Sequence, residues 1–333
     1  MRFPVISKTL AAVLASTVLA AAAHSQTLLN VSYDVSRELY KDINPAFSAY
    51  IRQQQQQDVS VNQSHGGSSR QAMAVAAGLE ADIVTMNQSP DIDMLVSNGL
   101  VDSNWREQFP HQATPYTTTS VFLVRKGNPK NIRDWDDLTR AGLTVIVPNP
   151  KTSGNGRYTY VAAWGYALEK TGSDAGAEQF VRALLGNVPV LDGGGRGATT
   201  TFTQRGVGDV LVTFENEAIL IAQELGSAGF DIVYPSLSVD ASAPVAIVKR
   251  VTERRSTTAL ARQYLDFLFS IEGQQIIAKH NFRPRNVDVL AVNASRFPAV
   301  KTFTVDEKLG GWEAVNQRHF AEGGLFDQIM VSR

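Results

Sequence analysis

Cysteine is absent from this 333-residue chain, so the protein has neither a disulfide bond nor a thiolate that acts as a nucleophile or metal ligand. An excess of one charge is lacking too, because 31 Lys and Arg residues face 32 Asp and Glu residues. Beyond residue 25 no segment approaches the ~20 consecutive apolar residues of a membrane helix. These absences predict a soluble protein without nucleic-acid partners and without membrane insertion.

The sequence contains no motif typical of a metal site or a nucleotide site. The four histidines beyond residue 25 show no metal-ligand spacing; they are His65, His111, His280 and His319. Residues 193–199 (GGGRGAT) lack the Lys-Ser/Thr ending of a phosphate-binding loop. We therefore expect no cofactor.

Catalytic groups are equally hard to assemble. His65 stands beside Ser64 and near Ser68, but neighbours in one tight turn seldom line up for proton transfer, and no third orienting residue is identifiable. Asp91 and Asp93 have no companion acid or histidine, which favours solvated surface carboxylates over a metal site. The chain is not expected to be an enzyme.

The first 25 residues have the pattern of a secretory signal peptide. Arg2 and Lys8 form a basic start, residues 10–23 are apolar, and small residues precede a cut before Gln26. Removing the leader takes 25 residues from 333 and leaves 308, with 29 basic and 32 acidic residues. This length exceeds the usual ~100 to 200 residues of one domain and predicts two lobes.

Strand-like and helix-like segments alternate along the rest of the chain, which predicts repeated βαβ units and a parallel sheet in each lobe. The expected strands are residues 28–33, 59–63, 81–86, 120–124, 144–147, 188–191, 209–214 and 244–249. The expected helices are residues 37–56, 69–79, 156–170 and 257–279. We expect one lobe in residues 26–120, a second in residues 121–244, and a return to the first lobe with C-terminal helices in residues 245–333.

Three Ser/Gly-rich turns each lie between a strand-like and a helix-like run. They are residues 64–69 (SHGGSS), 151–156 (KTSGNG) and 193–197 (GGGRG). A helix start leaves N–H groups without intrahelical acceptors and carries partial positive charge, so each turn is suited to hold an anion. No acidic residue lies inside any of the three, which indicates an oxyanion site.

Several longer motifs resemble one protein family. They are SYDVSREL (32–39), NQSHGGSS (62–69), FLVRKGNPKNIRDWDDL (122–138), PNPKTSGNGRYTYVAAWGYA (148–167), GGRGATTTF (194–202) and GDVLVTFENEA (208–218). In this order they resemble the periplasmic sulfate- and thiosulfate-binding proteins of ABC importers, from residue 28 to the C-terminus. The resemblance implies an α/β, two-lobed type II periplasmic binding protein fold, with the ligand in the interlobe cleft and an inner-membrane ABC permease as partner.

The resemblance also implies which groups hold the anion. The family's uncharged donors correspond here to the hydroxyls of Ser68 and Ser153 and to the N–H groups of Ser153, Gly154, Asn155 and Gly195. The family's aromatic N–H donor corresponds to Phe214, which has no donor. Asp34, His65 and Arg196 are expected to orient these donors without contacting the anion themselves.

The loss of a donor at Phe214 favours a softer, partly apolar anion, so we expect both sulfate and thiosulfate to bind, with thiosulfate weakly preferred. A protonated phosphate needs an acceptor that the three turns do not contain, so phosphate should be rejected. Two alternatives remain open at this point: a receptor for another oxyanion such as molybdate or phosphate, and a periplasmic enzyme on the same scaffold.

Overall fold

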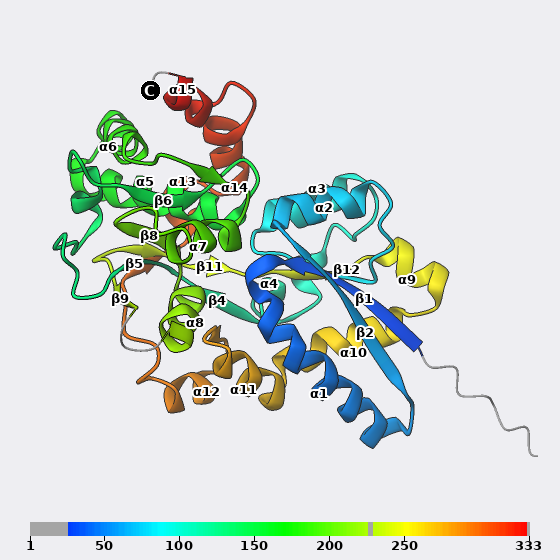
Figure 1. Cartoon of the computed structure of the whole chain (residues 1–333). Helices are drawn as coiled ribbons and strands as arrows, with labels where there is room; N and C mark the ends of the chain where they lie inside the picture. The colour runs from blue at the N-terminus through cyan, green and yellow to red at the C-terminus, as the bar shows by residue number, and fades with distance from the viewer. Residues whose placement is uncertain (1–25, 226–228, 332–333) are drawn as a thin grey trace, which may run out of the picture.

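The computed structural model describes residues 26–225 and 229–331, and the expected signal peptide lies outside them. Two α/β lobes lie side by side, each built around its own sheet (Figure 1). No helix within the described ranges is long and apolar enough to cross a membrane. The two-lobed α/β class expected from the sequence is confirmed.

The first lobe contains the four-stranded sheet β12-β3-β1-β2. Its strands are β1 (Gln26–Tyr33), β2 (Val59–Gly66), β3 (Ile83–Thr85) and β12 (Val245–Ile247). Helices α1 (Arg37–Gln55) and α2 (Ser68–Ala76) make the crossovers between parallel strands, as the alternation predicts. The returning strand β12 runs antiparallel to β3, so the sheet is mixed and not purely parallel.

The second lobe contains the five-stranded sheet β7-β6-β8-β5-β9. Its strands are β5 (Ser120–Arg125), β6 (Val145–Pro148), β7 (Leu191–Asp192), β8 (Val210–Phe214) and β9 (Phe230–Val233). Strands β6, β7 and β8 are parallel, whereas β5 lies antiparallel between β8 and β9. Helices α5 (Gly154–Thr171), α6 (Asp174–Gly186), α7 (Gly195–Thr203) and α8 (Glu215–Leu225) complete the lobe.

Short strands join the lobes. A three-stranded sheet pairs β4 (Tyr116–Thr118) with β11 (Ala241–Ser242) and β13 (Arg283–Pro284). Strand β4 leads into the second lobe and β11 leads back to the first, so these two connections between the lobes lie side by side. A second pair, β10 (Ser238–Val239) and β14 (Thr302–Phe303), follows on the side of the second lobe. The chain changes sheet between β4 and β5 and again between β11 and β12.

The expected helix over residues 257–279 is two helices, α10 (Thr258–Phe269) and α11 (Ile271–Lys279). Ser270 separates them, because its extended backbone ends α10 while its hydroxyl accepts the Gly273 N–H at 3.1 Å and so caps α11. Helix α10 packs against β12 and α1, where Tyr264 and Phe267 meet Phe47 edge-on, and α11 packs against α1. The remaining helices of the first lobe are α3 (Ser89–Ser97), α4 (Pro110–Ala113), α9 (Lys249–Arg255) and α12 (Val287–Val292).

The C-terminal helices α13 (Val305–Leu309) and α15 (Leu325–Val331) lie beside α5 and α6 of the second lobe (Figure 1). Helix α14 (Trp312–Val315) contacts both α5, through Trp312 and Tyr158, and α3 of the first lobe. The Lys151 ammonium bonds the carbonyls of Phe320 and Ala321 and the Asp327 carboxylate. From these contacts we propose that the first lobe ends before β14 and that residues 302–331 belong to the second lobe.

Candidate functional site

The three Ser/Gly-rich turns meet between the lobes, each at the carboxyl end of a strand. The Thr152 hydroxyl donates to the Gly193 carbonyl at 3.1 Å, and the Asn149 N–H donates to the Asp192 carbonyl at 2.7 Å, which joins the two turns of the second lobe. A Cβ atom on Gly67 of the first lobe would lie 2.8 Å from the Thr152 oxygen. The starts of α2, α5 and α7 therefore surround one point.

The start of α5 is capped by Ser153, whose hydroxyl oxygen accepts the Gly156 N–H at 3.4 Å and keeps its own proton free to donate. Gly154 and Asn155 are the first two residues of the helix, so their N–H groups have no intrahelical acceptor. Both residues are buried. The Ser153 N–H donates to the Asn149 carbonyl at 2.9 Å. Of the two donors expected at Ser153, the structure leaves only the hydroxyl available.

Ser68 begins α2 and is buried. Its hydroxyl donates its single proton to Asp91 Oδ2 at 2.5 Å and accepts the Asn87 N–H at 3.2 Å, so the hydroxyl donor expected at Ser68 is used inside the protein. Gln88 Nε2 donates to Asp91 Oδ1 at 3.0 Å. The expectation that Asp91 is a solvated carboxylate is wrong, because α3 turns this side chain inward and leaves it 4% exposed. Burial raises the pKa of Asp91, and the hydrogen bond from Ser68 opposes that rise.

Asp34 follows β1 and meets the start of α7 from the other lobe. Its Oδ2 accepts the Arg196 N–H at 3.4 Å, directly after Gly194 and Gly195. Burial raises the pKa of Asp34, while the Arg196 N–H and guanidinium oppose the rise. Asp34 thus contacts the backbone directly after Gly195, and its role in orienting the donors stays a prediction.

The Arg196 side chain turns away toward α8. Its Nε lies 3.4 Å from Oε1 of the fully buried Glu217, which also accepts the Thr199 hydroxyl at 3.0 Å. Burial raises the pKa of Glu217 to about 7. Arg196 is therefore engaged with an acid, and Lys151 is engaged likewise with Asp327 at 2.8 Å.

His65 lies on β2 opposite Ser32 of β1, and its Nδ1 is 2.6 Å from the Ser32 hydroxyl. Burial lowers the pKa of His65 to about 4, so the ring is neutral between pH 5 and 8. The neighbouring Ser64 hydroxyl exchanges hydrogen bonds with Gln71 and not with the imidazole. Ser32 is fully buried, so its pairing with His65 does not present a nucleophile to a substrate.

Phe214 is the last residue of β8 and is fully buried. Its ring packs edge-to-face against Tyr158, one turn after Gly154 in α5, with 5.9 Å between ring centroids. It places an apolar surface and no donor beside the start of α5, in agreement with the sequence.

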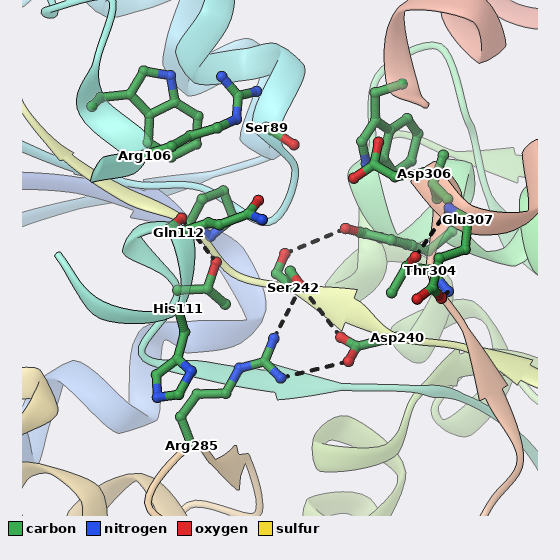
Figure 2. Close-up of a pocket in the computed structure, with 16 residues that line it drawn as sticks. Ser89, Arg106, His111, Gln112, Asp240, Ser242, Arg285, Thr304, Asp306 and Glu307 are labelled. Carbon is green, nitrogen blue, oxygen red and sulfur yellow. Dashed lines mark hydrogen bonds and ion pairs between the residues drawn. The ribbon is translucent and has the colours of Figure 1, made fainter. Parts of the chain in front are cut away.

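A cavity of about 450 Å³ lies between the lobes on the other side of Tyr158 (Figure 2). Its walls include Asp240, Ser242 and Arg285, and the Arg285 guanidinium bonds the Ser242 hydroxyl at 3.3 Å and lies 3.6 Å from Asp240. None of the six residues predicted to bind the anion lines this cavity. Its mixture of acidic and basic side chains contrasts with the uncharged donors of the three turns.

No group of three or more His, Asp or Glu side chains that could hold a metal occurs among residues 26–225 and 229–331. The three helix starts contain Ser68, Ser153, Gly154, Asn155 and Gly195, and Phe214 ends β8 beside α5. Their contact with an anion stays a prediction. Asn87, Gln88 and Asp91 were missed as neighbours of the site by the sequence reasoning, although all three follow β3 at the same sheet edge as Ser68.

Comparison with known proteins places this architecture in a family. Residues 28–283 match the model of the bacterial extracellular solute-binding proteins. A thiosulfate-binding protein of Pseudomonas aeruginosa is 53% identical over 317 residues, which cover 95% of this chain and 96% of that protein. A sulfate-binding protein of Escherichia coli is 52% identical over 303 residues, 91% of this chain and 92% of that protein.

A solved structure of a sulfate-binding protein has the same fold as this chain. The sulfate-binding protein SubI from Mycobacterium tuberculosis H37Rv is 34% identical, with a TM-score of 0.80, and the match covers 88% of this chain and 98% of that one. Both the sequence relatives and this structure thus span nearly the whole described chain. The protein therefore belongs to the bacterial extracellular solute-binding proteins, in the same family as the sulfate- and thiosulfate-binding proteins.

Proposed function

We propose that the protein is a periplasmic receptor that binds sulfate and thiosulfate between its lobes and delivers them to an inner-membrane ABC permease for sulfur uptake. The observation that carries the proposal is the convergence of three helix starts on one point, with the hydroxyls of Ser68 and Ser153 beside them. The close relatives named as thiosulfate- and sulfate-binding proteins support the same ligand class.

The electrostatics of the site suit a fully ionised oxyanion. The helix-start N–H groups and the Ser153 hydroxyl supply uncharged donors, and they act most strongly where the closed lobes exclude water. Lys151 and Arg196, which flank the turns, are already engaged with Asp327 and Glu217. Neither of these two cations is therefore free to pair with the anion.

Phosphate is disfavoured because it carries a proton at neutral pH and needs an acceptor. The fold brings the Asp91 carboxylate close to the turns, but its two oxygens already accept hydrogen bonds from Ser68 and Gln88. These bonds orient the carboxylate toward Ser68 and Gln88, so a phosphate O–H would need one of its remaining lone pairs. Calorimetry with sulfate, thiosulfate, molybdate and phosphate distinguishes these ligands, and we expect one competitive site for sulfate and thiosulfate, with thiosulfate weakly preferred. Independent, additive binding of the two anions would contradict one shared site.

Ser153→Ala is expected to weaken sulfate binding about tenfold or more, because one hydrogen bond to a charged ligand contributes roughly 1.5 to 3 kcal/mol. The control is Ser173→Ala, because the Ser173 hydroxyl caps α6 by accepting the Gly176 N–H in the same manner. Both variants lose a helix cap, but only Ser153→Ala should lose affinity in calorimetry. Equal affinities for the two variants would remove Ser153 from the anion site.

His65→Gln is expected to leave the pH dependence of sulfate affinity unchanged between pH 5 and 8. A lowered histidine pKa of about 4 means that the ring gains its proton only below this range, so no charge on His65 assists binding within it. Dissociation constants measured at fixed ionic strength test this point. A gain in affinity toward pH 5 that disappears in the variant would show that a protonated His65 contacts the anion.

We base the proposed export of the protein on its leader, and the proposed delivery of the anion to a permease on the family to which the chain belongs. The basic start and apolar run of residues 1–25 predict cleavage before Gln26 and release into the periplasm. The intact mass of protein recovered from the periplasmic fraction tests this prediction, because the mature chain should begin at Gln26. Reconstitution with candidate permeases in proteoliposomes tests the transport step, and no catalytic conversion of the anion is expected.

A further inference from the structure

The side chain of Asn87 lies at the centre of the three turns although it belongs to none of them. Asn87 follows β3 in the first lobe and is 5% exposed. Its backbone N–H donates to the Ser68 hydroxyl at 3.2 Å. Its carboxamide reaches across to the second lobe, where a Cβ atom on Gly154 would lie 1.9 Å from Oδ1 and 2.7 Å from Nδ2. Asn87 thus contacts two residues of the proposed anion site, one from each lobe.

The carboxamide of Asn87 has no hydrogen-bond partner within the described part of the chain. Its Oδ1 is buried and unpaired. The hydrogen bond that Asn87 forms with a described residue comes from its backbone N–H and not from its carboxamide. Buried amides are normally satisfied, so this amide is expected to find a partner that is not part of the protein. The two orientations of a carboxamide differ by a half-turn about one soft torsion, so either Oδ1 or Nδ2 can face the start of α5.

Asn155 on the other side of the site shows the contrast. Its Nδ2 donates to the Thr213 hydroxyl at 3.1 Å and packs against Gly195, so the protein itself holds that amide nitrogen. One of the two Nδ2 N–H groups of Asn155 is therefore committed inside the protein, while its Oδ1 is unpaired like that of Asn87. Asn87 is the carboxamide at this point whose donor group is uncommitted.

We propose that the Nδ2 group of Asn87 donates a hydrogen bond to the bound anion and is a specificity-determining group of the site. This inference rests on the proposed function. The amide adds a neutral donor from the first lobe, where the Ser68 hydroxyl gives its own proton to Asp91. It also supplies a side-chain N–H in a site where Phe214 has no donor. Because it approaches Gly154 from the opposite lobe, the bond can form only when the lobes are closed.

The test compares Asn87→Ala and Asn87→Asp with the wild type by calorimetry with sodium sulfate and sodium thiosulfate at pH 7. Losing a hydrogen bond to a charged ligand should weaken binding of both anions about tenfold or more in Asn87→Ala. Asn87→Asp keeps the shape but places a carboxylate beside a dianion, so a loss of at least about a hundredfold is expected. The controls are Asn98→Ala and Asn98→Asp, because Asn98 is an exposed residue just after α3 of the same lobe, and these should bind as the wild type does.

The melting temperature of the ligand-free protein separates a ligand contact from a structural role. We expect it to be unchanged or higher in Asn87→Ala, because the substitution removes an unpaired buried amide and no protein contact that the fold needs. Unchanged affinity in Asn87→Ala, an Asn87→Asp variant no weaker than Asn87→Ala, or a fall in ligand-free melting temperature that accompanies the loss of affinity would each overturn the inference. Failure of the wild type to bind either anion would instead refute the proposed function.

Discussion

Gly67→Val is expected to weaken sulfate and thiosulfate binding by about a hundredfold or more while both lobes stay folded. The three atoms nearest to a Cβ on Gly67 all belong to the second lobe, and the Thr152 carbonyl oxygen would be 2.8 Å away. That atom is backbone, so it cannot swing aside as a side chain would. Valine would therefore hold the lobes apart, and affinity falls with the fraction of protein that can close.

The fold of the first lobe should tolerate this change. Gly67 has φ −57° and ψ 133°, which any L-residue adopts, and no atom of its own lobe is among its close neighbours. Gly186→Val is the control, because a Cβ there would meet nothing within 4 Å and its φ is not positive. Calorimetry and circular dichroism on both variants test the prediction, and undiminished affinity in a folded Gly67→Val protein would mean that binding does not require this approach of the turns.

Glu215→Ala is expected to lower the free energy of unfolding by about 3 to 5 kcal/mol, because it leaves a partly buried guanidinium without its counter-charge. Glu215 is fully buried at the start of α8, directly after Phe214, and accepts two hydrogen bonds from Arg283, at 2.6 Å to Nε and 2.8 Å to Nη2. Arg283 lies in β13 of the sheet that joins the lobes. The pair therefore ties the second lobe to the connecting strands.

Glu178→Ala provides the comparison for this prediction. Glu178 forms an exposed ion pair with Arg182 four residues along α6, so its removal should change stability by less than about 1 kcal/mol. Urea unfolding followed by tryptophan fluorescence measures both variants at pH 7. Equal small losses would show that the Glu215 pair is not needed to stabilise the fold.

Where the sequence reasoning succeeded, the signal was local. Ser153 is followed three residues later by a glycine whose N–H it accepts, and Ser68 and Gly195 begin helices directly after Gly-rich turns. These patterns depend on a few consecutive residues, so they survive in any tertiary context. The break at Ser270 carried the same kind of signal, because Gly273 follows it by three residues, but the apolar periodicity on both sides concealed the cap.

Where it failed, the outcome depended on partners far along the chain. Asp91 appeared to be a surface acid because nothing near it in sequence pairs with it, yet Ser68, 23 residues earlier, lies 2.5 Å away. The N–H of Ser153 was expected to serve the anion, but the turn from Asn149 takes it internally at 2.9 Å. The antiparallel placement of β5 and β12 likewise follows from how the chain passes between the lobes.

The sequence by itself determined the two α/β lobes, the three helix starts and the uncharged character of their donors, because periodicity, capping and glycine content act over a few residues. Only the tertiary structure decided that the three turns meet, which of their donors stay free, and that Asn87 and Asp91 lie among them. Burial and hydrogen-bond pairing are properties of residues brought together from distant segments. The affinity of this site accordingly depends on contacts such as Gly67 against Thr152, which exist only when both lobes have folded and closed.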